Sequence, residues 1–97
     1  MAINPYFPRP GGNANLLNIT AAAVVKATPG TIYNVSVTTA GSAPGAVHDV
    51  ATVGAAAAAN LVASIPNTVG NYSLIFPCAT GIVVTPGTGQ VLSVSYN

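Results

Sequence analysis

Hydrophobic and polar residues alternate along several short segments of this chain. In the segments 33–39, 71–76 and 92–97, Val, Leu, Ile, Tyr or Phe mostly alternates with Asn, Ser or Thr. Antiparallel strands with one face in a core and the other in solvent produce this period of two. The sequence therefore predicts an all-β domain.

Clusters of Gly, Pro and Asn separate these strand-like segments. Thr28-Pro29-Gly30-Thr31 and Thr85-Pro86-Gly87-Thr88 carry the same turn signal. Pro presets the first central residue of a type II turn, and Gly accepts the positive φ of the second. We expect both to close hairpins. The spacing of the turn signals predicts an antiparallel β-sandwich of about seven strands, near residues 18–27, 31–40, 46–53, 60–65, 71–77, 80–85 and 90–96.

The segment 54–64 is ambiguous because five consecutive alanines, Ala55 to Ala59, lie within it. Alanine has the highest intrinsic helix propensity. An isolated helix of about ten residues is nevertheless marginal without packing, and Gly54 and Pro66 bound the segment tightly. The pattern leaves open a short helix or an extended segment, whose small side chains would let backbones or subunits approach closely.

The first residues differ from the rest of the chain. Three prolines between residues 1 and 13 remove backbone donors and favour an extended conformation. We therefore divide the chain into an extended N-terminal arm, 1–13, and one β-sandwich domain, 14–97. The adjacent aromatics Tyr6 and Phe7 either fold back onto this domain or anchor the arm in a neighbouring subunit. Together with Arg9, they are the candidate partner-binding residues.

Charged side chains are very scarce, since Arg9, Lys26 and Asp49 are the three in the chain and the net charge is +1. A typical domain is about one quarter charged, and a small domain usually needs a net charge to stay dispersed alone. We therefore expect a protein that works docked against other proteins. Two basic residues do not make a nucleic-acid groove.

No membrane or export segment is expected. The longest apolar run, 54–65, falls short of the roughly 20 residues of a spanning helix. No basic region followed by an apolar stretch opens the chain. We therefore expect no membrane partner, and synthesis in the cytoplasm.

Candidate chemical groups are few. His48-Asp49 is the one pair suited to acid–base work, but neighbours in a strand point to opposite faces. No second histidine or acid completes a triad or metal shell, so we expect no enzyme, cofactor or metal site. We expect Asp49 to accept backbone donors or to pair with Lys26 or Arg9. The single cysteine, Cys78, is expected to be a buried apolar residue.

Three segments, 18–20, 34–36 and 71–73, match the Asn-X-Ser/Thr glycosylation triplet. Chance matches are expected in a chain this rich in Asn, Ser and Thr. We interpret these segments as polar faces of strands.

Two stretches of the chain carry a resemblance to a known group of proteins. The first stretch is Val25-Lys26-Ala27-Thr28-Pro29-Gly30-Thr31-Ile32-Tyr33, followed by Val35-Ser36-Val37-Thr38-Thr39-Ala40-Gly41. The later stretch comprises His48-Asp49, Ile65-Pro66, 71–76, 80–84 and 91–96. These stretches resemble small virion proteins of tailed bacteriophages. The resemblance leaves the N-terminal arm outside, and the alanine run stands where such proteins tend to have a more polar connection.

The resemblance implies a β-sandwich with jelly-roll character in a capsid decoration or cement protein, or in a small tail or fibre component. Cement proteins of this kind lie over the seams between major capsid subunits. We accordingly expect the major capsid protein as partner, self-association as a dimer or trimer, and a place on the capsid surface after synthesis in the host cytoplasm.

A glycan-binding β-sandwich module on a fibre is the alternative. Sugar sites usually combine exposed aromatic rings with acids or amides. This chain has no Trp and only six aromatic residues, four Tyr and two Phe. Composition therefore favours the cement protein.

Overall fold

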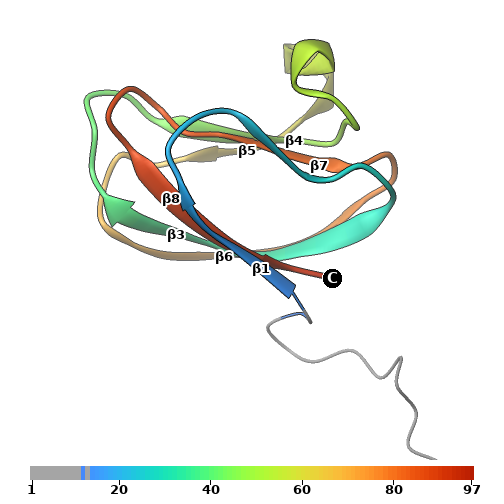
Figure 1. Ribbon diagram of the computed structural model, residues 1–97, viewed down its shortest axis with the longest axis horizontal. Helices are drawn as coiled ribbons and strands as arrows, with labels where there is room; N and C mark the ends of the chain where they lie inside the picture. Colours follow the sequence, from blue (N-terminus) through green and yellow to red (C-terminus); the bar gives the residue numbers. More distant parts are fainter. Residues whose placement is uncertain (1–11, 13) are drawn as a thin grey trace, which may run out of the picture.

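The structure, a computed structural model, describes residue 12 and residues 14–97 as two antiparallel β-sheets packed face to face (Figure 1). One sheet has the strand order β1-β8-β3-β6 and the other the order β2-β7-β4-β5. The strands are β1 (Ala14–Ile19), β2 (Ala23–Lys26), β3 (Gly30–Thr39), β4 (Gly45–His48), β5 (Leu61–Ile65), β6 (Gly70–Cys78), β7 (Ile82–Thr85) and β8 (Val91–Tyr96). The predicted all-β fold of antiparallel sheets is confirmed.

The core lies between the two sheets and consists of the inward-facing residues of the alternating segments. In β8, Leu92 and Val94 are buried, whereas Ser93 and Ser95 point away from the core. Burying one such aliphatic side chain contributes about 1.5–3 kcal/mol. The core cluster comprises Ile19, Ile32, Val35, Val37, Val47, Ile65, Cys78, Ile82, Val84, Leu92 and Val94.

Most connections between consecutive strands cross from one sheet to the other. The two Pro-Gly turns join β2 to β3 and β7 to β8, and in both cases the joined strands belong to different sheets. The predicted hairpins are therefore wrong at these turns. A Pro-Gly signal fixes the φ angles of two residues, but it does not determine which sheet the chain enters next. In the described part of the chain, β4 and β5 are the consecutive strands that pair directly.

Residues 14–26 form two strands rather than the single strand predicted near 18–27. β1 and β2 lie in different sheets, and the chain crosses between them at residues 20–22. The described residues consequently contain eight strands instead of about seven. Just before the crossing, β1 is irregular: Asn18 has a φ of 55°, and the register shifts between Leu16 and Ile19. Asn tolerates this left-handed conformation better than most residues.

The connection between β4 and β5 contains two short 3₁₀ helices, η1 (Val53–Ala55) and η2 (Ala58–Asn60). The strand predicted for 46–53 thus ends at His48. The alanine run combines the two alternatives, because Ala55, Ala58 and Ala59 belong to the short 3₁₀ helices whereas Ala56 and Ala57 are extended. The Asn60 side chain orders the run by accepting from the Ala57 N–H at 2.9 Å and donating to the Ala55 oxygen at 3.0 Å. In the described part of the chain, no helix has the length and apolar character needed to cross a membrane.

The β4–β5 connection packs outside the β2-β7-β4-β5 sheet (Figure 1). Val83 lies between the core residues Ile82 and Val84, so it faces outward, and it is nevertheless fully buried. Its burial shows that the outer face of this sheet is partly covered.

β6 is an edge strand, because it pairs with β3 alone within its sheet. The register shifts between Ile32 and Asn34, where β6 carries an extra residue and Ile75 adopts a φ of 47°. Two residues later, Pro77 has no N–H to donate. The bulge helps to explain why Ile75 and Phe76 are exposed, at 62% and 42%, although the alternation places Phe76 on the core side.

Candidate functional site

The predicted partner-binding residues Tyr6, Phe7 and Arg9 lie outside the described residues. The arm's role in binding a neighbouring subunit therefore stays a prediction. The described residues nonetheless contain three places to compare with the expected chemistry: the His48-Asp49 pair, the Cys78 thiol, and the outer faces of the two sheets.

Asp49 joins two loops at one end of the sandwich. Its Oδ2 accepts from the Ala79 N–H at 2.9 Å, and its Oδ1 accepts from the N–H groups of Thr80 and Gly81 at 2.8 and 3.2 Å. The N–H of Asp49 itself donates to the Asn60 oxygen at 2.8 Å. The prediction that Asp49 accepts backbone donors is confirmed, and its role is structural.

The same contacts set the ionisation of Asp49. Partial burial raises the pKa of its carboxyl group, but the three backbone hydrogen bonds lower it, and the net pKa lies below the ordinary 3.8. A carboxylate that accepts several N–H donors is stabilised in its charged form. Asp49 is therefore ionised at neutral pH and is a poor proton donor there.

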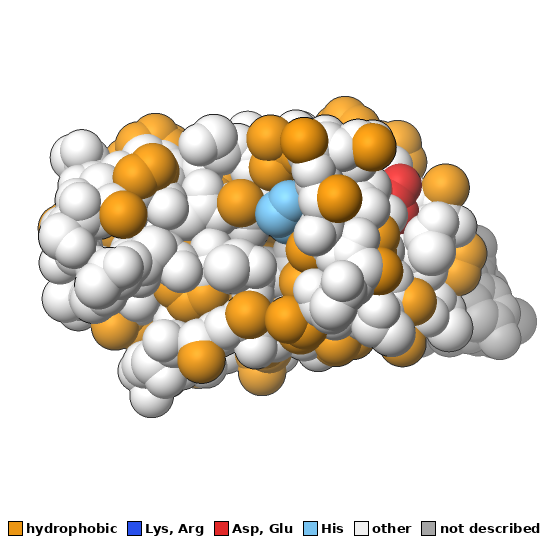
Figure 2. Space-filling view, turned by 90° about the horizontal axis from the view of Figure 1, so that it is seen from above, with side chains coloured by type: hydrophobic (Ala, Val, Ile, Leu, Met, Phe, Trp, Pro, Cys, Tyr) orange, Lys and Arg blue, Asp and Glu red, His pale blue; other side chains and the backbone are white. Residues whose placement is uncertain are grey.

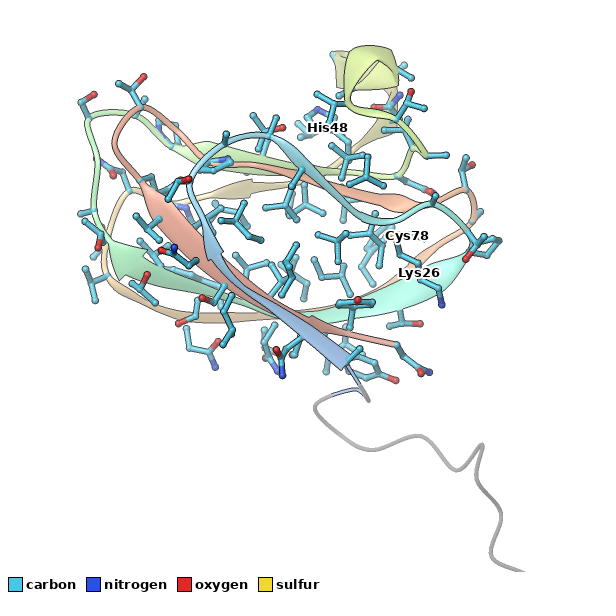
Figure 3. All side chains as sticks on the ribbon, in the orientation of Figure 1. Lys26, His48 and Cys78 are labelled. Atoms are coloured by element: carbon cyan, nitrogen blue, oxygen red, sulfur yellow. The ribbon has the colours of Figure 1, made fainter. Side chains whose placement is uncertain are left out.

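His48 does not form an acid–base unit with Asp49. It ends β4 in a cross-strand row that runs from Val24 through Val83 and His48 to Leu61. Its Nδ1 is buried and has no hydrogen-bond partner among the described residues, while the Asp49 oxygens are bound to backbone. Figure 3 places His48 outside the sandwich and Cys78 between the sheets.

Cys78 is buried, as predicted, with 3% of its surface exposed. Burial and, as the smaller cause, the nearby negative charge of Asp49 together raise the pKa of its thiol to about 11. A thiol with this pKa is almost entirely protonated at neutral pH and is a weak nucleophile. Within the described residues, no three His, Cys, Asp or Glu side chains gather as a metal site.

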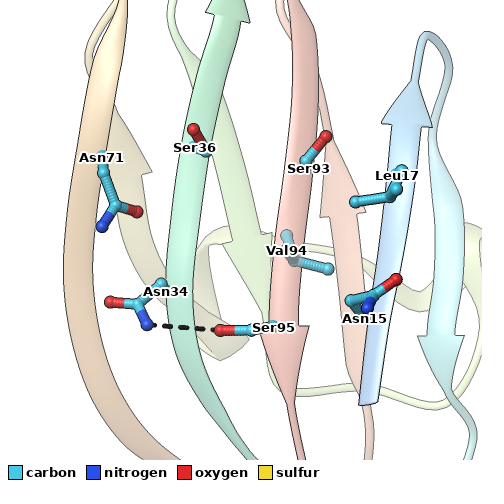
Figure 4. A pocket seen from close by; sticks show the side chains of 8 residues that line it. All are labelled: Asn15, Leu17, Asn34, Ser36, Asn71, Ser93, Val94 and Ser95. Atoms are coloured by element: carbon cyan, nitrogen blue, oxygen red, sulfur yellow. Dashed lines mark hydrogen bonds between the residues drawn. The ribbon is translucent and has the colours of Figure 1, made fainter. Parts of the chain in front are cut away.

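The outer face of the β1-β8-β3-β6 sheet carries an open groove of about 270 Å³, which we name the polar groove (Figure 4). Cross-strand pairing places Asn15, Ser95 and Asn34 side by side on three neighbouring strands. A second row joins Ser93, Ser36 and Asn71 on β8, β3 and β6. The groove is lined by Asn15, Leu17, Asn34, Ser36, Asn71, Ser93, Val94 and Ser95.

Several polar side chains of this groove have hydrogen-bonding groups that no other described residue uses. Asn34 Nδ2 donates to Ser95 Oγ at 3.3 Å, and Ser93 Oγ accepts from the Asn18 N–H at 3.3 Å. The side chains of Asn15 and Asn71 make no hydrogen bond within the described part of the chain. Among the residues that the structure describes, none that lines the groove is charged.

Sequence reasoning found the pieces of this groove but not the groove itself. The triplets 34–36 and 71–73 were predicted to be polar strand faces, and both contribute residues to the polar groove. Asn15 and Leu17 lay outside the predicted strand near 18–27. The missing information was the strand order, which no local pattern contains.

The opposite sheet presents an apolar outer face, defined here by Val24, Val83, His48 and Leu61. Val24 and Leu61 are 41% and 47% exposed, so this face keeps apolar surface in contact with solvent. Figure 2 shows hydrophobic side chains gathered around His48 on this side of the molecule. The molecule thus has one polar and one apolar sheet face.

Comparisons with known proteins give no further guidance. No family model, curated protein or solved structure matches the chain. The functional argument therefore depends on the fold and the two sheet faces.

Proposed function

We propose that this chain is a structural protein of a tailed-bacteriophage particle, which decorates and cements the capsid by bridging major capsid protein subunits. The observation that carries the proposal is the strand order, β1-β8-β3-β6 in one sheet and β2-β7-β4-β5 in the other. We interpret this order as an eight-stranded jelly roll, since each sheet combines strands from both halves of the chain. Viral capsid proteins and lectin domains are frequent users of that architecture.

The charge distribution supports a docked protein. The two charged side chains of the described residues are bonded to backbone: Asp49 to the 79–81 loop and Lys26 Nζ to the Asn97 oxygen at 3.0 Å. These backbone partners partly compensate both charges, which lowers the cost of desolvating them when a protein partner covers the apolar face. Desolvating an unpaired charge would oppose such binding.

The apolar face is the surface proposed to contact the major capsid protein. Half-exposed Val24 and Leu61 offer apolar area without charge. Each contact of this kind is weak, but a symmetric shell repeats it, and linked contacts add to a high overall affinity. Self-association as a dimer or trimer would add to this effect.

Particle binding tests the proposal. Purified wild-type chain is added to capsids assembled without it, and occupancy is measured by co-sedimentation and by a map of the decorated particle. Leu61→Asp should reduce the affinity at least about tenfold, because a charge would then have to be buried in the contact. The matched control Asn71→Asp adds the same charge to the opposite sheet face and should bind like the wild type.

Density on the tail or on a fibre, with none on the capsid shell, would replace the decoration role with that of a tail component. Absence of the chain from intact particles would refute a virion function. Normal binding of Leu61→Asp would exclude the apolar face as the contact surface.

A further inference from the structure

We infer that the polar groove on the β1-β8-β3-β6 sheet binds an uncharged glycan. This inference is independent of the capsid proposal, because it concerns the opposite sheet and a different kind of ligand. It depends on the chemistry of the lining residues, on their unused hydrogen-bonding capacity, and on the absence of charge from the groove.

The lining residues match the hydrogen bonding of sugar hydroxyl groups. A sugar hydroxyl both donates and accepts, so its best partners are groups that can do the same. An Asn side chain supplies two N–H donors and a carbonyl acceptor, and a Ser hydroxyl supplies one donor and two acceptor positions. The groove combines three such amides, Asn15, Asn34 and Asn71, with the hydroxyls of Ser36, Ser93 and Ser95.

The free amides lie at opposite sides of the groove. Asn15 is on edge strand β1 and Asn71 on edge strand β6, with β8 and β3 between them. Neighbouring strands are about 4.8 Å apart, so these two strands are separated by roughly 14 Å. A ligand that binds both amides has to be extended across the sheet, as an oligosaccharide is and a single sugar is not.

Leu17 adds the apolar surface that a sugar ring requires. It lines the groove beside Asn15, and 64% of its surface is exposed. The C–H face of a sugar ring can pack on such a side chain, although an aromatic ring would offer more contact area. We therefore expect weak affinity, with a dissociation constant of about 1 mM.

The lack of charge selects among glycans. An acidic glycan would bring carboxylates or sulfates next to lining residues that, in the described part of the chain, include no Lys or Arg. Desolvating those charges without a cationic partner is unfavourable. The groove should therefore prefer neutral oligosaccharides.

A second copy of this chain fits the groove less well than a glycan. A stable protein interface buries about 800 Å² per partner and has an apolar, well-packed centre. Leu17 is the one exposed large hydrophobic residue among those lining the groove. The remaining surface is suited to ligands that form hydrogen bonds.

The test is an NMR titration of the full ¹⁵N-labelled chain. The probes are neutral oligosaccharides of glucose, galactose, mannose and N-acetylglucosamine, with heparin oligosaccharides as the acidic comparison. The side-chain amide signals of Asn15, Asn34 and Asn71 report directly on the groove. We expect at least one neutral probe to shift these signals, and heparin to leave them unchanged.

Two matched variants locate the binding. Ser36→Tyr fills the middle of the groove, and Ser64→Tyr adds the same ring to the outer face of the other sheet, where Ser64 is exposed beside Ala46. Ser36→Tyr should weaken binding at least tenfold, and Ser64→Tyr should leave it unchanged. Should Ser36→Tyr unfold, Asn71→Ala replaces it, since Asn71 is exposed and unpaired among the described residues.

Three outcomes would overturn the inference. The first is that no neutral probe shifts the amide signals at a concentration about ten times the expected dissociation constant. The second is that heparin binds more strongly than the neutral probes. The third is that the shifted signals belong to residues outside the groove. If the wild-type chain binds a neutral glycan but does not bind capsids, only the decoration proposal is refuted.

Discussion

Asp49→Ala should remove most of the acid sensitivity of this fold. Asp49 is the single acidic side chain of the chain, and its pKa in the folded protein lies below the ordinary value of 3.8. A carboxyl group whose pKa is lower in the folded state contributes stability that is fully present above the unfolded pKa. That stability is lost as the pH falls through the folded pKa, because the unfolded chain then binds the proton more readily.

The magnitude follows from the three accepted hydrogen bonds. A hydrogen bond to a charged group contributes about 1.5–3 kcal/mol when it is buried, but Ala79 and Thr80 are exposed, so water can replace the carboxylate there. Gly81 is buried, and its N–H would lose its partner. We therefore expect Asp49→Ala to lower the free energy of unfolding by about 2 kcal/mol. This corresponds to a Tm lower by about 8–16 °C for a domain of this size.

Urea unfolding between about pH 6 and pH 2.5 measures the effect. The free energy of unfolding of the wild type should exceed that of Asp49→Ala at pH 6, and the difference should shrink steadily below about pH 4. Groups common to both proteins cancel in this difference. A difference that stays constant down to pH 2.5 would refute the assignment of acid sensitivity to Asp49.

Three further experiments test the packing. Gly41→Ala should lower the free energy of unfolding by about 2 kcal/mol or more, because a Cβ there would collide with the backbone of the 88–90 turn. Gly54→Ala has open space around it, so its free energy of unfolding should be unchanged or higher by up to about 1 kcal/mol. Equal urea midpoints for the two variants would contradict this. Ile75→Asn should raise the free energy of unfolding by about 1 kcal/mol, because Ile75 has a φ of 47°, which Asn adopts more easily, and its side chain is largely exposed. An unchanged or lower value in urea unfolding would show that the Ile75 backbone is not strained. Ellman's reagent should react with Cys78 at pH 8 at least about 100-fold more slowly in the folded chain than in urea, given a pKa raised to about 11; similar rates would mean an accessible thiol.

The strands themselves were largely predictable, because each side chain's environment follows from its position within an alternating segment. The predicted strand at 90–96 agrees closely with β8, Val91–Tyr96, whose Leu92 and Val94 reach the core. The order of strands was not predictable from the same signal. The sequence signal of the Pro29-Gly30 turn is the same whether the two strands it joins pair as a hairpin or belong to different sheets.

The crossing at 20–22 was missed because Thr20 and the alanines after it give no turn signal. The irregularity just before the crossing is the positive φ of Asn18. Asn is also common in polar strand faces, so its presence did not indicate an irregular backbone. The polar groove was missed for a related reason. Asn34 and Asn71 are 37 positions apart in the sequence and become neighbours only through the pairing of β3 with β6.

The irregular edge of β6 has a consequence for contacts between copies of this chain. A regular outermost strand would recruit the same strand from another molecule, and repetition of that step builds cross-β fibres. The kink at Ile75 and the missing donor at Pro77 interrupt the ladder that such growth requires. Strand-by-strand growth of fibres from the β6 edge is therefore disfavoured.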